Sequence, residues 1–150
     1  MDRKEQVTAM NIENLHRQHA GILNEVRYLL AAAQQPDYAD HLGEITLRIN
    51  KLAGQLNMHL MSEDNYLYPS LLRSRNARIR DIATRYNQEM GGLVAAFQEY
   101  KDRFNAPFKI KADGDAFVSQ TKLVMDSIAH RIQKEDGQLY PLIAATANSN

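Results

Sequence analysis

Histidine and glutamate occupy positions in this sequence where a helix would be expected to bury apolar side chains. His59 and Glu63, followed by Tyr66, continue at steps of three and four a line that runs Ile45, Ile49, Leu52 and Leu56. Imidazole nitrogens and carboxylate oxygens are ligands for transition-metal cations. A carboxylate buried without a partner costs several kcal/mol, so Glu63 needs a cation or hydrogen-bond donors close by. The pattern therefore predicts a buried metal ion or, failing that, a network of buried ion pairs.

A second copy of the motif lies near the end of the chain. The run His59-x-x-x-Glu63-Asp64-x-x-Leu67-Tyr68-Pro69 recurs as His130-x-x-x-x-Glu135-Asp136-x-x-Leu139-Tyr140-Pro141. A duplicated helical hairpin would explain the shared Leu, Tyr and Pro as packing and helix termination. It gives no reason for a buried histidine and glutamate in both copies, whereas a symmetric metal site would explain both.

The two copies differ in the spacing of their ligands. His59 and Glu63 are four residues apart, which stacks both side chains on one face of a helix. His130 and Glu135 are five apart, about 140° around an ideal helix. Both can therefore reach a core only from opposite edges of the buried face or across a π-bulge.

The elements that must position these residues are four long helices. Each of the four segments, at about 11–34, 38–68, 76–105 and 115–140, shows a helical apolar period, and prolines stand near their ends. Four helices of similar length favour a bundle, so the predicted fold class is all-α. The other expected buried lines are Ile12, His16, His19, Leu23, Val26, Leu30; then Ile79, Ala83, Tyr86, Met90, Leu93, Phe97, Tyr100, Phe104; and then Phe117, Thr121, Val124, Ile128, Ile132, Glu135, Leu139.

Composition narrows the class of protein further. A length of 150 residues predicts one domain over residues 1–150. Cysteine is absent, which excludes disulfides and thiolate ligands and suggests a reducing compartment. The 18 basic and 18 acidic residues give no electrostatic case for nucleic acid or an anionic membrane. We therefore expect a cytoplasmic protein with no nucleic-acid or membrane partner.

The motifs resemble those of the hemerythrin-like, or His-His-Glu cation-binding, domains. The second helix of that family carries His-x-x-x-Glu and the fourth carries His-x-x-x-x-Asp around two irons. The resemblance covers nearly the whole chain and implies an up-and-down antiparallel four-helix bundle. It implies metal ligation by His19 in the first helix, by His59 and a bridging Glu63 in the second, and by His130 and Glu135 in the fourth.

The third helix departs from the family pattern. The oxygen carriers of the family have His-x-x-x-His there, whereas this chain has Tyr86-x-x-x-Met90 and no histidine in the segment. Three residues are candidates to complete the ligand set. They are His16, one turn from His19; Tyr86, whose phenolate would suit ferric iron; and Glu89.

The resemblance implies a non-haem iron protein. Its centre would hold two irons with a bridging oxo or hydroxo group, and it would bind or sense dioxygen, peroxide or nitric oxide. Zinc or manganese would suit the same nitrogen and oxygen ligands. The incomplete third helix motivates one alternative, a metal-free bundle that serves as an interaction or regulatory module. A ferritin-like oxidase ranks lower, because it needs Glu-x-x-His on two helices and only Glu13-x-x-His16 occurs.

Overall fold

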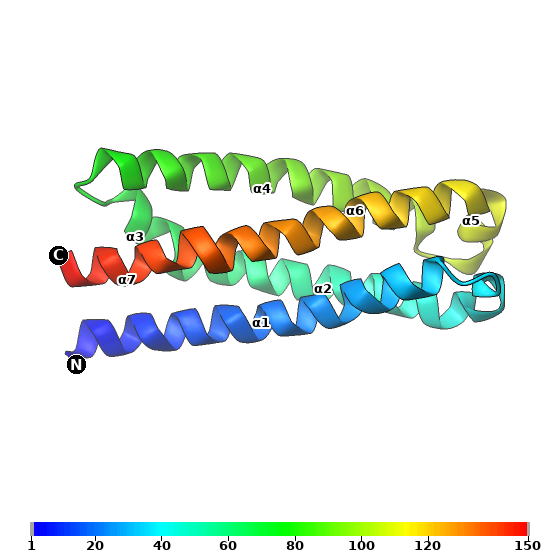
Figure 1. Cartoon of the computed structure of the whole chain (residues 1–150), viewed down its shortest axis with the longest axis horizontal. Helices are drawn as coiled ribbons and strands as arrows, with labels where there is room; N and C mark the ends of the chain where they lie inside the picture. The colour runs from blue at the N-terminus through cyan, green and yellow to red at the C-terminus, as the bar shows by residue number, and fades with distance from the viewer. Residues whose placement is uncertain (1, 150) are drawn as a thin grey trace.

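The computed structural model describes residues 2–149, apart from the side chains of residues 4, 5 and 146–149. Within this range the chain consists of helices joined by short turns, without a strand (Figure 1). The predicted all-α class is confirmed. None of the described helices combines the length and the apolar character needed to cross a membrane.

Four long helical rods make up the molecule. They are α1 (Arg3–Ala33), α2 (Leu42–Tyr66), α4 (Ala77–Phe104) and α6 (Gly114–Lys134). Successive rods run in opposite directions, and the two chain ends lie at the same end of the molecule (Figure 1). Each rod packs against two others, α1 and α4 both contacting α2 and α6.

Short elements connect or extend the rods. A 3₁₀ turn, η1 (Tyr38–His41), precedes α2, while α3 (Tyr68–Leu72) and α5 (Pro107–Ala112) lie between rods. A π-helical turn, η2 (Glu135–Leu139), and α7 (Tyr140–Ser149) prolong α6. The predicted arrangement of four simple helices is therefore confirmed only in part.

Local sequence signals explain most of the boundaries. The Asn76 side chain accepts a hydrogen bond from the Arg78 amide and caps α4, and Asp113 caps α6 through the Ala116 amide. Proline stands in the first turn of α3 and of α5, where its missing N–H costs nothing.

The fourth helical segment extends beyond its predicted end at residue 140. The helix continues through η2 into α7, so Pro141 stands in the first turn of α7 instead of ending the helix. The π-turn widens the helix immediately before the proline, where the Tyr140 amide bonds to the Glu135 carbonyl. A proline next to such a turn is compatible with a continuing helix.

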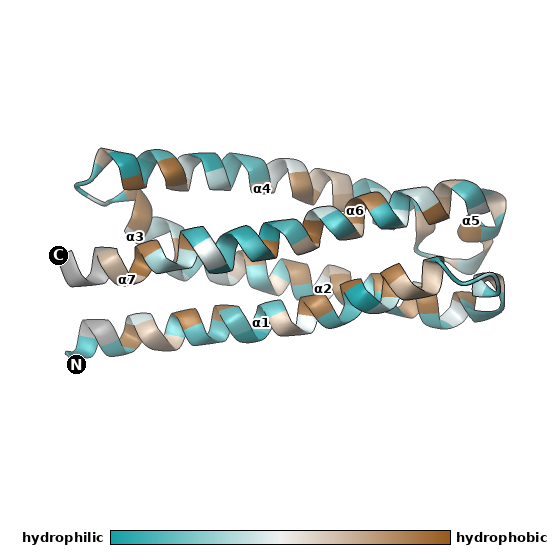
Figure 2. Cartoon of the chain, in the orientation of Figure 1, coloured by the Kyte–Doolittle hydropathy of each residue, from teal (hydrophilic) through white to brown (hydrophobic). Residues whose placement is uncertain are grey.

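The buried lines of the rods follow the predicted apolar periods closely in α2, α4 and α6, except that Tyr66, the last residue of α2, is exposed. In α1 the buried line is instead Leu15, His19, Ile22, Val26 and Leu29, and His16 is exposed. Hydrophobic positions recur along each rod between hydrophilic ones (Figure 2). They form two apolar clusters, one around Ile22, Leu52 and Ile132 and the other around Leu15, Leu67 and Leu139. On α1, α2 and the α6–η2 run, a buried polar residue separates the two clusters.

Candidate metal centre

Three helical elements bring four polar donors together between the apolar clusters. His19 comes from α1, His59 and Glu63 from α2, and Glu135 from the start of η2, and none is more than 2% exposed. We call these four residues the four-donor centre. The i, i+4 spacing of His59 and Glu63 puts both on the inner face of α2, as expected.

The donor atoms of His19, His59 and Glu135 all lie within 4.8 Å of one another, as ligands of one ion would, and Glu63 lies beside this group, next to His59. His19 Nε2 lies 3.0 Å from His59 Nε2 and 2.8 Å from Glu135 Oε1. His59 Nε2 lies 3.3 Å from Glu135 Oε1 and 3.5 Å from Glu63 Oε2. Two ligand atoms about 2.1 Å from one ion, at right angles, would lie about 3 Å apart. The arrangement therefore fits a cation.

Hydrogen bonds on the far side of each imidazole determine its tautomer, because they require a proton on Nδ1. The Nδ1 atom of His19 donates to the Asp136 carboxylate at 2.8 Å, and that of His59 donates to Gln18 Oε1 at 2.8 Å. The Gln18 amide is itself oriented, because its Nε2 donates to Ser62 Oγ at 2.9 Å. When both rings are neutral, with the proton on Nδ1, each Nε2 turns a lone pair toward the other histidine. A cation between the two lone pairs removes their repulsion.

The charges in the centre also favour a bound cation. Burial raises the pKa of Glu63, and its Oε1 atom is buried without a hydrogen-bond partner. Burial opposes the charged form of His59, but hydrogen bonds to Glu135 and Glu63 outweigh it and raise the pKa of His59 to about 9. Burial also opposes ionisation of Glu135, yet His19, His59 and Arg131 hold its pKa well below the usual range. In metal-free protein a proton on His59 therefore supplies part of the positive charge that the two carboxylates need.

A tyrosine hydroxyl lies against all four donors. Tyr140 Oη is 3.0 Å from His19 Nε2, 3.3 Å from His59 Nε2, 3.0 Å from Glu63 Oε2 and 3.2 Å from Glu135 Oε1. Its ring stacks on that of His19. Burial and the two negative carboxylates raise the pKa of Tyr140, so without a metal the hydroxyl stays neutral and donates to Glu63. The π-turn brings this hydroxyl to Glu135 on the same face.

The structure does not bring His130 into this centre. His130 is exposed on α6, in a groove beside Leu30 and Leu123. The backbone from Gly114 to Lys134 is regular α-helix, and the π-turn begins only at Glu135. No widened turn therefore lies between His130 and Glu135 to bring them onto one face of the helix, and their side chains point in different directions.

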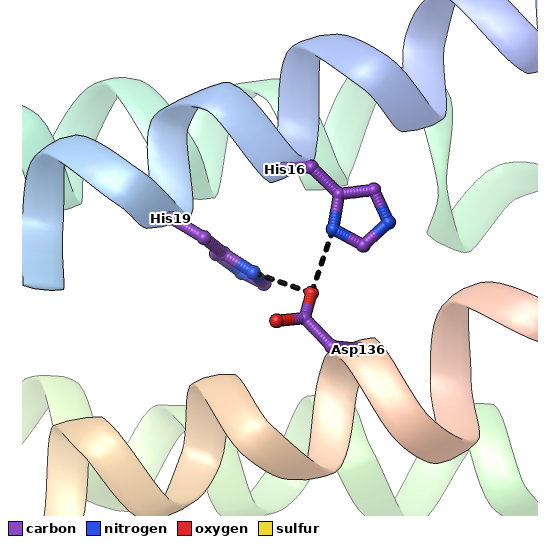
Figure 3. Close-up of side chains that lie close together, drawn as sticks. All are labelled: His16, His19 and Asp136. Atoms are coloured by element: carbon purple, nitrogen blue, oxygen red, sulfur yellow. Dashed lines mark hydrogen bonds and ion pairs between the residues drawn. The ribbon is translucent and has the colours of Figure 1, made fainter.

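The three candidates proposed to complete the ligand set lie outside the four donors. His16 is at the rim, where its Nδ1 and that of His19 both contact Asp136 Oδ1, at 2.9 and 2.8 Å (Figure 3). Tyr86 is buried in α4, but its hydroxyl donates to Gln138 at 2.6 Å. Glu89 is exposed and pairs with basic side chains of α6. His16, His19 and Asp136 form a second, more exposed group with metal-ligand geometry.

Sequence reasoning missed four residues of the site, Gln18, Arg131, Asp136 and Tyr140. Two of them belong to the repeated motif, in which they read as packing or helix termination. A strict offset of 72 residues, from Glu63 to Glu135, pairs His59 with Arg131 instead of His130. Applied to His59, this offset would have identified Arg131 as a candidate residue of the site.

Comparison with family models agrees with the geometry. The model of the hemerythrin HHE cation-binding domain matches residues 10–143. The chain therefore belongs to the hemerythrin HHE cation-binding domain family. No curated protein and no solved structure matches it.

Proposed function

We propose that this chain is a non-haem iron protein that binds or senses dioxygen, peroxide or nitric oxide, in a single domain with the family's up-and-down bundle. His19, His59, Glu63 and Glu135 are its iron ligands. The observation that carries the proposal is the convergence of the Nε2 atoms of two imidazoles with two buried carboxylates. When bound there, a six-coordinate iron would have positions free for a small ligand and could change its oxidation state.

The chain's own residues define the surroundings of that ion. Asp136 and Gln18 hold the two imidazoles in the orientation and tautomer that ligation needs. Tyr140 offers a hydroxyl beside the donors, as a hydrogen-bond donor to a small ligand. Apolar clusters on both sides exclude water.

The ligand set favours sensing over reversible oxygen carriage. Two of the four ligands are carboxylates, and hard oxygen ligands stabilise the ferric state. A carrier must return to the ferrous state each time it releases oxygen. The same oxygen and nitrogen donors would also accept zinc or manganese, so iron is chosen on its redox chemistry.

Iron content and the response to nitric oxide test this function. Protein from iron-supplemented cells should contain iron, and nitric oxide should change the absorption spectrum of the anaerobic ferrous protein. We expect His59→Ala to lose most of both, because one donor is removed and Glu63 and Glu135 lose a neighbour. His130→Ala is the matched control: an exposed histidine outside the centre should be dispensable.

Two results would contradict the proposal. One is iron-free wild-type protein after supplementation. The other is an equal loss of iron from both variants, with circular dichroism showing that both remain folded.

A further inference from the structure

The two halves of the site differ at one position of the internal repeat. Counted at the strict offset of 72 residues, the second copy reproduces the first at its glutamate, aspartate, leucine, tyrosine and proline. Four residues before the glutamate, however, the first copy has His59 and the second has Arg131. The second half therefore carries a guanidinium where the first carries a metal-ligating imidazole.

Arg131 occupies the same structural place in its half as His59 does in the other. Its Nε atom donates to Glu135 Oε2 at 2.9 Å, four residues away on the same helical run. Its Nη2 atom donates to the hydroxyl of Tyr68 at 3.0 Å. Arg131 thus contacts the glutamate of its own copy and the tyrosine of the other.

The first half shows the same pair of contacts. His59 Nε2 lies 3.5 Å from Glu63 Oε2 and 3.3 Å from the hydroxyl of Tyr140. Tyr140 belongs to the second copy and Tyr68 to the first, so the tyrosine of each copy contacts the other copy. In these two contacts, with a glutamate and with a tyrosine, Arg131 corresponds to His59.

The two oxygens of Glu135 face different cationic partners. Oε1 faces the imidazoles of His19 and His59, at 2.8 and 3.3 Å. Oε2 faces Arg131, so the carboxylate spans the space between the four-donor centre and the guanidinium. A carboxylate that bridged two metal ions would use its oxygens in the same way.

The guanidinium cannot itself bind a metal. It has five N–H donors, no free lone pair and a permanent positive charge. Arg131 is only 6% exposed, and the Tyr86 ring covers it at 4.6 Å. The segment of α4 on this side carries no histidine. A second metal ion here would have a guanidinium in place of the imidazole of the first half, and the buried positive charge would repel it.

We infer that the centre holds one metal ion, and that the Arg131 guanidinium takes the place of a second. The inference rests on the proposed iron site and revises the expectation of two ions drawn from the sequence. The Glu135 carboxylate then lies between the metal ion on its Oε1 side and the Arg131 guanidinium on its Oε2 side.

Iron stoichiometry with a magnetic readout tests the inference. Metal-free wild-type protein is titrated anaerobically with Fe(II), freed of excess metal, oxidised, and measured by elemental analysis and electron paramagnetic resonance. We expect one iron per chain and a high-spin ferric signal that accounts for all of it. Two irons per chain, with the signal lost to magnetic coupling, would overturn the inference while leaving the proposed function intact.

Variants of Arg131 test its role separately. Arg131→His restores an imidazole four residues before Glu135, and we expect iron to rise from one toward two per chain. Arg131→Lys keeps the charge and should remain at one. If wild type and a folded Arg131→His both bind one iron, Arg131 is not what excludes the second ion. If wild-type protein binds none, the proposed function itself fails.

Discussion

Glu135→Gln is expected to destabilise the metal-free protein by about 3–5 kcal/mol, because it breaks a buried ion pair by removing one partner. Glu135 is fully buried and accepts a hydrogen bond from Arg131 Nε at 2.9 Å. The substitution leaves the guanidinium buried beside a neutral amide. For a chain of 150 residues, such a loss lowers the melting temperature by roughly 10 °C.

Glu63→Gln is the matched control for this effect. Glu63 is equally buried, but no arginine in the described part of the chain forms an ion pair with it, and burial raises its pKa toward the neutral form that glutamine imitates. We expect a loss of about 1 kcal/mol or less. Thermal unfolding of both variants, followed by circular dichroism in the presence of a chelator, makes the comparison. Equal losses would show that Arg131 does not depend on Glu135.

Metal-free protein is expected to lose stability as the pH rises from about 6.5 to 9, because His59 loses its proton over that range. The pKa of His59 is raised from 6.5 to about 9 in the folded chain. A raised pKa stabilises the fold fully below the unfolded value, and the gain disappears as the pH passes the folded value. The shift corresponds to about 3 kcal/mol. The raised pKa of Glu63 acts in the same direction.

His59→Gln and the metal-loaded protein provide the controls for this pH dependence. The variant has no titrating group at that position and should show a flatter profile between pH 6.5 and 9. In the loaded protein a metal ion replaces the proton, so affinity should rise with pH as protons cease to compete. Melting temperatures of the metal-free wild type, the His59→Gln variant and the metal-loaded protein, measured across this pH range, test the expectation. A metal-free protein that gained stability toward pH 9 would contradict the account.

Much of the fold and half of the centre follow from apolar periodicity. The period of α2 placed His59 and Glu63 on the buried line, and that of α6 placed Glu135 there. In α1 a one-residue difference in register moved His16 to the rim, while His19 lies on both possible lines. A period estimated from a few apolar residues does not fix the rotation of a helix to better than this.

The remainder of the centre depends on contacts between rods, which a pattern along one helix does not contain. Asp136 and Tyr140 reach His19 only because η2 and α7 pack against α1. The position of the π-turn decided between His130 and Arg131, since a widened turn before Glu135 would have altered which of them shares its face. Sequence spacing indicated that such a turn was possible and did not place it.

We expect one cation between α1, α2 and the α6–η2 run. Anomalous diffraction at the iron absorption edge, from crystals of iron-loaded protein, would locate it. The map should show a single strong peak within bonding distance of His19 Nε2, His59 Nε2 and a carboxylate oxygen of both Glu63 and Glu135, with the Arg131 guanidinium beyond Glu135. A peak at the rim between His16 and Asp136, or no peak in iron-saturated crystals, would contradict this expectation.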